Sequence, residues 1–229
     1  MIVTAGKDIR RHVDFSLPVS GDLPPAFARG GFVVCPDVVR PGRAREWRQR
    51  AVDIARRCAR QIEQQTEAHL LRYRVVTGDL IATEWPELFA FYQSAELREW
   101  VAAIAGVPTT FPSPHLQSAI NVNVMGEPGD IYRWHTDASG FTLLLYLSDS
   151  HEADGGSLEI RAPDGRGTTA MVPAAGTVVL MDGTRCLHRV SPVMRRHERI
   201  SIPMVFTPTE AHERPTGLDD YLYSAPGQP

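Results

Sequence analysis

Three side chains that could bind a transition metal stand out: His135 and Asp137, separated by one residue, and His188 much later in the chain. In an extended segment, residues i and i+2 project to the same side, so His135 and Asp137 can enter one pocket. Two histidines and one carboxylate on one face of a metal leave the opposite face open. That arrangement is typical of iron(II) oxygenases, in which the open positions take a chelating cosubstrate and dioxygen.

Arg199 and Ser201 follow His188 in the segment RISIPMVF, which is rich in β-forming residues. On a strand, these two side chains share a face. A guanidinium fork beside a hydroxyl is suited to binding a carboxylate through two hydrogen bonds. Because Lys7 is the only lysine, the sequence has no P-loop lysine, and arginine must hold any anion that is bound.

Each of these residues also has a purely structural interpretation. An HxD pair is common in turns, a histidine can be a satisfied structural residue, and a strand arginine can form a surface ion pair. We prefer the metal and cosubstrate interpretation because all four elements occur in order: the HxD pair, the distal histidine, the arginine and the serine.

Four polar or aromatic residues near the HxD pair are candidate contacts for the bound molecules. Asn123 could hydrogen-bond the cosubstrate or the substrate, and Asn121 shares its face of a predicted strand. Tyr132 and Trp134 are expected at the pocket entrance, as substrate contacts. The alternatives are a polar barrel rim for the asparagines and core packing for Trp134.

Arg72 and Arg74 alternate in the segment LLRYRVV. Arg74 is a candidate to reach a substrate carboxylate from an N-terminal lid. The alternative is that both arginines are solvated residues on an edge strand, where such charges are common.

The elements that must position these residues change character along the chain. After a Pro/Gly-rich loop, residues 32–35 are expected to form a strand, and apolar residues at spacings of three and four predict a helix over about 41–68. A second helix is predicted from Ser94, an N-cap residue, to Ala105, before Gly106. From Gln117 onward, short β-type runs separated by turns predict a sandwich or barrel, with His188 in a loop. The tail after Pro208 is expected to be loose.

The composition is that of an ordinary globular protein: 229 residues, 43% apolar and 22% charged, with a formal charge of −3. No excess of basic residues favours nucleic acid or an anionic membrane. The three cysteines are expected to be reduced thiols. Since neither a leader nor a membrane-length apolar run is seen, we expect a cytoplasmic protein with no membrane partner, and the oligomeric state stays open.

The ordered motifs resemble those of the iron(II)/2-oxoglutarate-dependent dioxygenase superfamily: WHTD, then LHRVSPV, then RIS, over roughly residues 121–206. More loosely, RWHTDASGFTLLLYL is similar to compact bacterial hydroxylases of free amino acids, whose relatives include halogenases. The resemblance implies that His135, Asp137 and His188 bind Fe(II), and that Arg199 with Ser201 binds the C5 carboxylate of 2-oxoglutarate. Dioxygen would be the second cosubstrate.

The resemblance also implies a fold: an α+β chain, mainly β, with a double-stranded β-helix (jelly roll) core and N-terminal helices packed on one sheet. We expect a single dioxygenase domain over 1–229, with a helical support region at 1–116, the core at 117–208 and a C-terminal tail at 209–229.

The resemblance further implies hydroxylation of a small polar metabolite, such as an amino acid or a natural-product intermediate. The family's halogenases have Gly or Ala at the carboxylate position, where this chain has Asp137. Nucleic-acid demethylases of the family carry a second arginine where Val205 stands, which argues against a nucleic-acid substrate. Desaturation, cyclisation or epimerisation with the same cofactors, and a non-catalytic sensor, are the alternatives.

Overall fold

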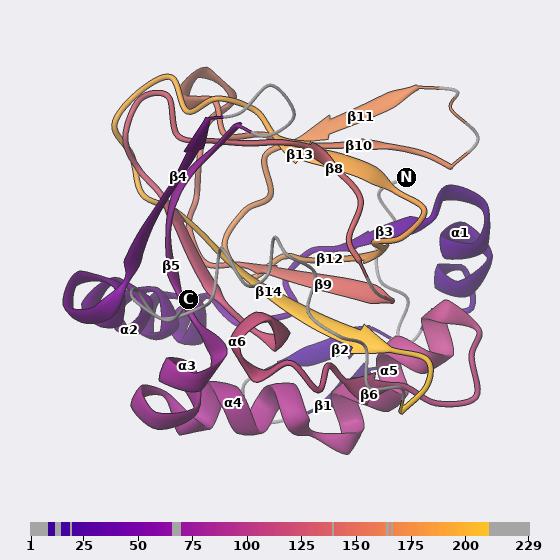
Figure 1. The fold of residues 1–229 in the computed structure, drawn as a ribbon. Helices are drawn as coiled ribbons and strands as arrows, with labels where there is room; N and C mark the ends of the chain where they lie inside the picture. Colours follow the sequence, from indigo (N-terminus) through magenta and orange to yellow (C-terminus); the bar gives the residue numbers. More distant parts are fainter. Residues whose placement is uncertain are drawn as a thin grey trace.

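The computed structural model describes residues 9–11, 15–18, 20–65, 70–138, 140–163, 165 and 167–210. Figure 1 shows the arrangement of its elements in space. Within these ranges no helix is both long and apolar enough to cross a membrane. Most of the tail that the sequence predicts to be loose, residues 211–229, lies outside the described residues.

The helices of the described chain precede most of the strands. They are α1 (Leu23–Gly30), α2 (Pro41–Cys58), α3 (Gly78–Glu84), α4 (Pro86–Gln93), α5 (Ala95–Ala105) and the short α6 (Leu116–Ala119), with a 3-10 turn, η1, at Glu152–Asp154. The predicted second helix is confirmed as α5. The Ser94 hydroxyl accepts a hydrogen bond from the backbone N–H of Leu97 at 3.3 Å, and Gly106 ends the helix in the left-handed conformation.

The helix predicted over 41–68 is wrong in its second part. Helix α2 ends at Cys58, and Ala59 adopts an extended conformation. Residues Arg60–Gln65 then form a strand, β4, which pairs with β5 (Leu70–Val76). Ile62 continues the helical spacing from Cys58 but lies in a strand, where it faces Tyr73. Its neighbours Gln61 and Glu63 are polar, so this stretch also shows the alternation of a half-buried strand.

The remaining strands build one curled antiparallel sheet. They are β3 (Phe32–Cys35), β6 (Phe111–Pro112), β7 (Val122–Met125), β8 (Ile131–His135), β9 (Phe141–Tyr146), β10 (Leu158–Arg161), β11 (Thr168–Met171), β12 (Val178–Asp182), β13 (Leu187–Val190) and β14 (Arg199–Thr207). A separate pair is formed by β1 (Ile9–Arg11) and β2 (Ser16–Pro18).

The curled sheet forms two facing layers. The large layer runs β7, β14, β9, β12 and β3, and the small layer runs β8, β13, β10 and β11. Strand β5 joins them, because its first part pairs with β8 and its last part with β7. This half-barrel with flanking helices is consistent with a double-stranded β-helix, so the predicted fold class is confirmed. The N-terminal region is not only helical support, since β3, β4 and β5 belong to the sheet.

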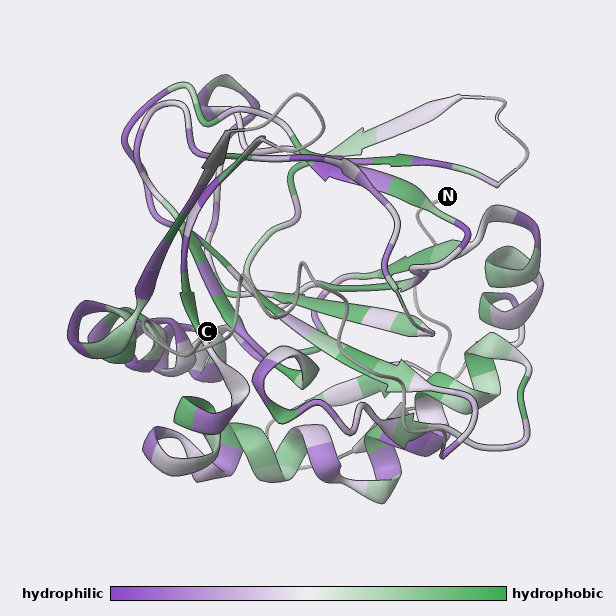
Figure 2. Ribbon diagram, in the orientation of Figure 1, coloured by the Kyte–Doolittle hydropathy of each residue, from purple (hydrophilic) through white to green (hydrophobic). Residues whose placement is uncertain are grey.

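Each face of the large layer has a distinct role. Even-numbered residues of β14, such as Ile200 and Ile202, are buried in the core shared with the helices, beside Trp47 and Trp100. In Figure 1 the helices α3, α4 and α5 lie on the side of this layer away from β8, β10, β11 and β13. Figure 2 shows strands β9, β12 and β14 as mainly hydrophobic, whereas α2 carries long hydrophilic stretches. The opposite, inward face of the large layer carries the odd-numbered residues of β14, which include Arg199 and Ser201.

Tyr92 of α4 ties the helical layer to the sheet. Its buried hydroxyl donates to the carbonyl of Val205 at 2.7 Å and accepts the backbone N–H of Ser113 at 2.8 Å. The Ser113 N–H also donates to the Val205 carbonyl at 3.0 Å, so both backbone groups keep one partner without the hydroxyl. We predict that Tyr92→Phe lowers the free energy of unfolding by about 0.5–1.5 kcal/mol through loss of the two hydroxyl hydrogen bonds. Urea denaturation measures this, and an unchanged midpoint would show that water satisfies these groups instead.

Candidate metal centre and carboxylate pocket

The two candidate histidine ligands face each other across the small layer. His135, at the end of β8, pairs with His188 of β13, and their ring centroids lie 4.1 Å apart. His188 was expected in a loop, but it lies within a strand, next to Ile160 of β10. Paired residues of neighbouring strands share a face, so both imidazoles point to the same side of the layer.

Asp137 completes the cluster from the segment just after β8. Its Oδ1 lies 3.6 Å from the Nε2 of His135 and 3.6 Å from the Nε2 of His188. One ligand atom from each of the three residues falls within 4.8 Å of the others, close enough to hold one metal ion. The predicted convergence of the HxD pair and the distal histidine is therefore confirmed.

Hydrogen bonds orient all three side chains. The Nδ1 of His135 lies 2.8 Å from the carbonyl of Arg133, and the Nδ1 of His188 lies 3.0 Å from the carbonyl of Cys186. Because a carbonyl only accepts, each Nδ1 carries the proton and each Nε2 presents a lone pair towards the cluster. The Thr142 hydroxyl donates to the Oδ2 of Asp137 at 2.5 Å, which leaves Oδ1 facing the histidines.

The protonation state also suits metal binding. Burial, followed by the neighbouring His188, lowers the pKa of His135 to about 4. The imidazole is therefore neutral near pH 7, as a metal ligand must be.

Gly183 makes room for the Asp137 carboxylate. The Asp137 N–H donates to the Gly183 carbonyl at 2.8 Å, which places the two residues in contact. A Cβ at position 183 would lie 2.2 Å from Asp137 Oδ2 and 2.8 Å from its Cγ. The turn Asp182-Gly183 thus needs glycine because of the side chain it faces.

Arg199 lies buried on the inward face of the large layer. Its Nε donates to the carbonyl of Gly156 at 2.7 Å, and its Nη2 lies 3.3 Å from the hydroxyl of Tyr146. Its Nη1 lies 3.3 Å from the Ser201 hydroxyl and 3.7 Å from the Met125 sulfur. All these partners are neutral, and no acidic residue in the described chain forms an ion pair with Arg199. A buried guanidinium with only neutral partners fits an external carboxylate.

Arg199 and the metal cluster lie on the inward faces of the two layers. Tyr146 packs in one apolar cluster with Ile160, which is paired with His188 on the small layer. Asn123 pairs with Ser201 and so shares the inward face, and its buried Oδ1 has no hydrogen-bond partner within the described chain. This orphaned oxygen is a further polar group that a bound molecule can satisfy.

Tyr132 stands beside the metal cluster on the inward face. Its ring centroid lies 4.3 Å from that of His135 and 5.3 Å from that of Tyr73. His188 pairs with His135 and Val190 with Tyr132, so between these pairs one residue of β13 opposes two of β8. This β-bulge brings Tyr132 and His135 to one face although they are three residues apart. A substrate contact from Tyr132 stays a prediction.

Trp134 and Arg74 lie on outward faces, which corrects their expected places. Trp134 is held between the guanidinium groups of Arg161 and Arg189, at 4.3 and 4.8 Å from its ring centroid. Arg189 adjoins His188 and therefore faces the other way. Arg74 pairs with Val124, on the face that packs against the helices. Because β5 is paired on both sides, it is neither an edge strand nor a lid.

Asn121 and Arg72 are engaged in local structure. The Asn121 amide donates to the carbonyl of Gln117 at 2.8 Å, next to the short helix α6. Arg72 forms an ion pair with Asp130 at 3.0 Å. A substrate contact from Asn121 stays a prediction.

Sequence reasoning missed several inward-facing residues. The hydroxyls of Thr142 and Tyr146, the sulfur of Met125 and the backbone of Gly156 and Gly183 contact the candidate site residues directly. The one available signal was parity: Thr142 and Tyr146 share a face of the strand that follows the HxD pair.

Comparison with known proteins agrees with this geometry. The model of the 2OG-Fe(II) oxygenase superfamily matches residues 120–207, the segment that contains the metal cluster, Arg199 and Ser201. A search of curated protein sequences finds no significant match.

Solved structures share the fold at low sequence identity. An oxidoreductase of the 2OG-Fe(II) oxygenase family from Burkholderia pseudomallei is 17% identical, with a TM-score of 0.65 over 82% of this chain and 90% of that one. The non-haem alpha-ketoglutarate-dependent epimerase SnoN from nogalamycin biosynthesis is 18% identical (TM-score 0.69; 91% and 90%). A Pseudomonas putida prolyl-4-hydroxylase is 18% identical (TM-score 0.59; 80% and 95%).

The structural likenesses establish the fold, and the family model adds the motif-bearing segment. Together with an intact His-x-Asp and distal His set, they identify the cofactors as iron and 2-oxoglutarate. Residues 120–207 of this chain match the 2OG-Fe(II) oxygenase superfamily, and the intact His135, Asp137 and His188 set in this segment is that of a 2-oxoglutarate-dependent non-haem iron oxygenase.

Proposed function

We propose that Fe(II) is bound by the Nε2 atoms of His135 and His188 and by a carboxylate oxygen of Asp137. The observation that carries this proposal is the clustering of these three ligand atoms within 4.8 Å. In both histidines Nδ1 donates its proton to a backbone carbonyl, so Nε2 is already unprotonated and can bind the metal without a change of tautomer.

Arg199 then binds the distal carboxylate of 2-oxoglutarate, assisted by the hydroxyls of Ser201 and Tyr146. Burial raises the pKa of Tyr146, so its hydroxyl stays protonated and can donate to a carboxylate. Asn123, on the same face, offers its amide to the cosubstrate or substrate. Arginine is suited to this role because its planar fork matches a carboxylate.

The reaction proposed is hydroxylation of a C–H bond in a small polar metabolite, such as an amino acid or a natural-product intermediate. When bound, iron and 2-oxoglutarate supply the oxidising chemistry, in which dioxygen is consumed and 2-oxoglutarate yields succinate and carbon dioxide. The protein's own contribution is positioning, and Tyr132 beside His135 is the described side chain best placed to orient the substrate. Asp137 favours hydroxylation over halogenation because it fills the position that a halide would need.

Epimerisation is the second candidate outcome. It is favoured by one observation, the structural likeness to an epimerase over nine-tenths of this chain. The two outcomes share every residue proposed above, and the placement of the substrate's target carbon decides between them.

The metal assignment predicts a specific effect of Gly183→Ala. The added methyl group would displace the Asp137 carboxylate, because its Cβ would lie 2.2 Å from Oδ2. We expect iron affinity to fall at least about tenfold, measured by anaerobic Fe(II) titration. Gly42→Ala is a control for the substitution itself, because an added Cβ there meets no atom within 4 Å and the backbone is not in the left-handed region that favours glycine. Unchanged iron affinity in Gly183→Ala would contradict the assignment of Asp137.

The cosubstrate assignment predicts that Arg199→Met abolishes 2-oxoglutarate binding while iron binding persists. Methionine keeps much of the side-chain volume but removes the charge that the carboxylate needs. The matched control is Arg189→Met, because Arg189 pairs with Glu159 on the outward face and should not affect either ligand. The readout is the visible charge-transfer band that forms on anaerobic addition of 2-oxoglutarate to the iron(II) protein.

The reaction itself is tested by product analysis. Iron(II) protein with 2-oxoglutarate, oxygen and a panel of amino acids and natural-product intermediates should form succinate with at least one compound. Hydroxylation adds one oxygen to the product mass, whereas epimerisation leaves the mass unchanged. Absence of succinate across the panel, with 2-oxoglutarate bound, would favour a non-catalytic sensor.

A further inference from the structure

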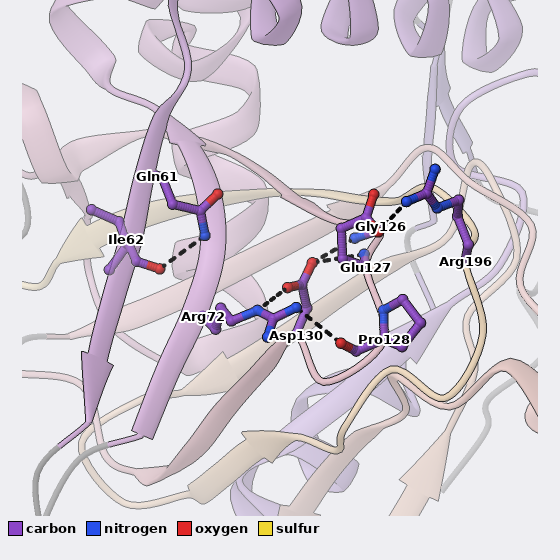
Figure 3. Close-up of polar contacts among 8 residues, drawn as sticks. All are labelled: Gln61, Ile62, Arg72, Gly126, Glu127, Pro128, Asp130 and Arg196. Atoms are coloured by element: carbon purple, nitrogen blue, oxygen red, sulfur yellow. Dashed lines mark hydrogen bonds and ion pairs between the residues drawn. The ribbon is translucent and has the colours of Figure 1, made fainter.

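Asp130 is a buried carboxylate in the turn that precedes β8, the strand that ends at His135. Its Oδ2 accepts the backbone N–H groups of Gly126 and Glu127 at 2.8 and 2.9 Å. Its Oδ1 accepts Arg72 Nε at 3.0 Å, and Arg72 Nη2 donates to the carbonyl of Pro128 at 2.9 Å. Figure 3 shows the Arg72 side chain, from β5, reaching the turn between β7 and β8. The ion pair therefore closes this turn and ties it to a neighbouring strand.

Backbone hydrogen bonds join the turn between β7 and β8 to the connection between β13 and β14. The Gly129 N–H donates to the Val193 carbonyl at 2.8 Å, and the Val193 N–H donates to the Asp130 carbonyl at 2.8 Å. The His197 N–H donates to the Gly126 carbonyl at 3.2 Å. Three backbone hydrogen bonds thus fix the 191–198 segment, which leads directly into Arg199.

The same connection holds the carbonyl that orients Arg199. The Gly156 N–H donates to the Pro192 carbonyl at 3.2 Å, and Gly155 forms a β-bridge with Val193. The Gly156 carbonyl then accepts Arg199 Nε at 2.7 Å. A Cβ at Gly156 would lie 3.0 Å from Arg199 Cδ, so the backbone approaches the arginine stem closely.

We propose that Arg72 and Asp130 are positioning residues that fix the direction of the Arg199 guanidinium and thereby the affinity for the distal carboxylate of the 2-oxoacid cosubstrate. This rests on the proposed function of Arg199. Neither residue touches the cosubstrate; they act through the turn, the 191–198 segment and Gly156. Binding through two hydrogen bonds depends on the direction of the guanidinium plane, which the Nε bond to Gly156 sets.

The test compares two 2-oxoacids in Asp130→Asn. Asparagine keeps the size of the side chain but has one acceptor oxygen, so it cannot bind both Arg72 and the turn amides. Dissociation constants for 2-oxoglutarate and for pyruvate, which lacks a distal carboxylate, are measured by anaerobic titration of the iron(II) protein. We expect the 2-oxoglutarate constant to rise about tenfold, with the pyruvate and iron constants unchanged.

Two further variants sharpen the comparison. Arg72→Met should reproduce the selective loss and, since the Arg72 side chain is 36% exposed, threatens folding less than a change at Asp130. Arg196→Gln is the matched control, because Arg196 binds Glu127 of the same turn with a side chain that is 80% exposed. It should bind both 2-oxoacids as the parent does.

An equal loss of both 2-oxoacids would show a merely structural role and overturn the proposal, as would unchanged 2-oxoglutarate affinity. These outcomes are separable from failure of the proposed function. If Arg199→Met removes 2-oxoglutarate binding while Asp130→Asn is silent, only the positioning role is lost. If Arg199→Met itself binds 2-oxoglutarate normally, the carboxylate assignment is wrong.

Discussion

The pairing of β8 with β13 is the constraint on which the rest of the site depends. It sets His135 opposite His188, and both imidazoles then point inward. A slip of one residue would turn His188 to the outward face and bring Arg189 inward in its place. The apolar neighbours specify the register, because Ile160 and Leu158 of β10 are fully buried only when they face inward with His188.

A second constraint is the buried charge of Arg199. Removing a guanidinium from water is costly, and the described protein returns only neutral hydrogen bonds: a carbonyl, two hydroxyls and a thioether. An incoming carboxylate recovers the remaining electrostatic energy. Part of the desolvation free energy of Arg199 is therefore not recovered within the protein, and it is recovered when a cosubstrate carboxylate binds. Buried charges are commonly used in this way at functional sites.

Much of the site was readable from the sequence because residue types limited the choices. His135, Asp137, His188 and Arg199 carry the right chemistry in the right order, and i,i+2 spacing places Asp137 near His135. Alternation could also have placed Trp134 outward, since it adjoins His135. The inward position of Tyr132 could not be derived in this way, because a bulge in β8 reverses its parity.

The fold was predictable where local signals were unambiguous. Ser94 and Gly106 define α5 through capping, whereas no comparable signal marks the end of α2 at Cys58. Long-range facts were out of reach: Gly183 against Asp137, Tyr146 against Arg199, and β5 between the layers all depend on which strands pair. Strand pairing follows from packing of the whole chain, so short sequence patterns do not determine it.

We propose that one iron ion and one 2-oxoglutarate molecule share the inward face, bound by residues from both layers. A crystal structure of the anaerobic iron(II) protein with 2-oxoglutarate, with anomalous data at the iron edge, tests it most directly. We expect a single iron peak between His135, Asp137 and His188, and the distal carboxylate of 2-oxoglutarate on Arg199. An iron peak elsewhere, or a cosubstrate carboxylate distant from Arg199, would contradict it.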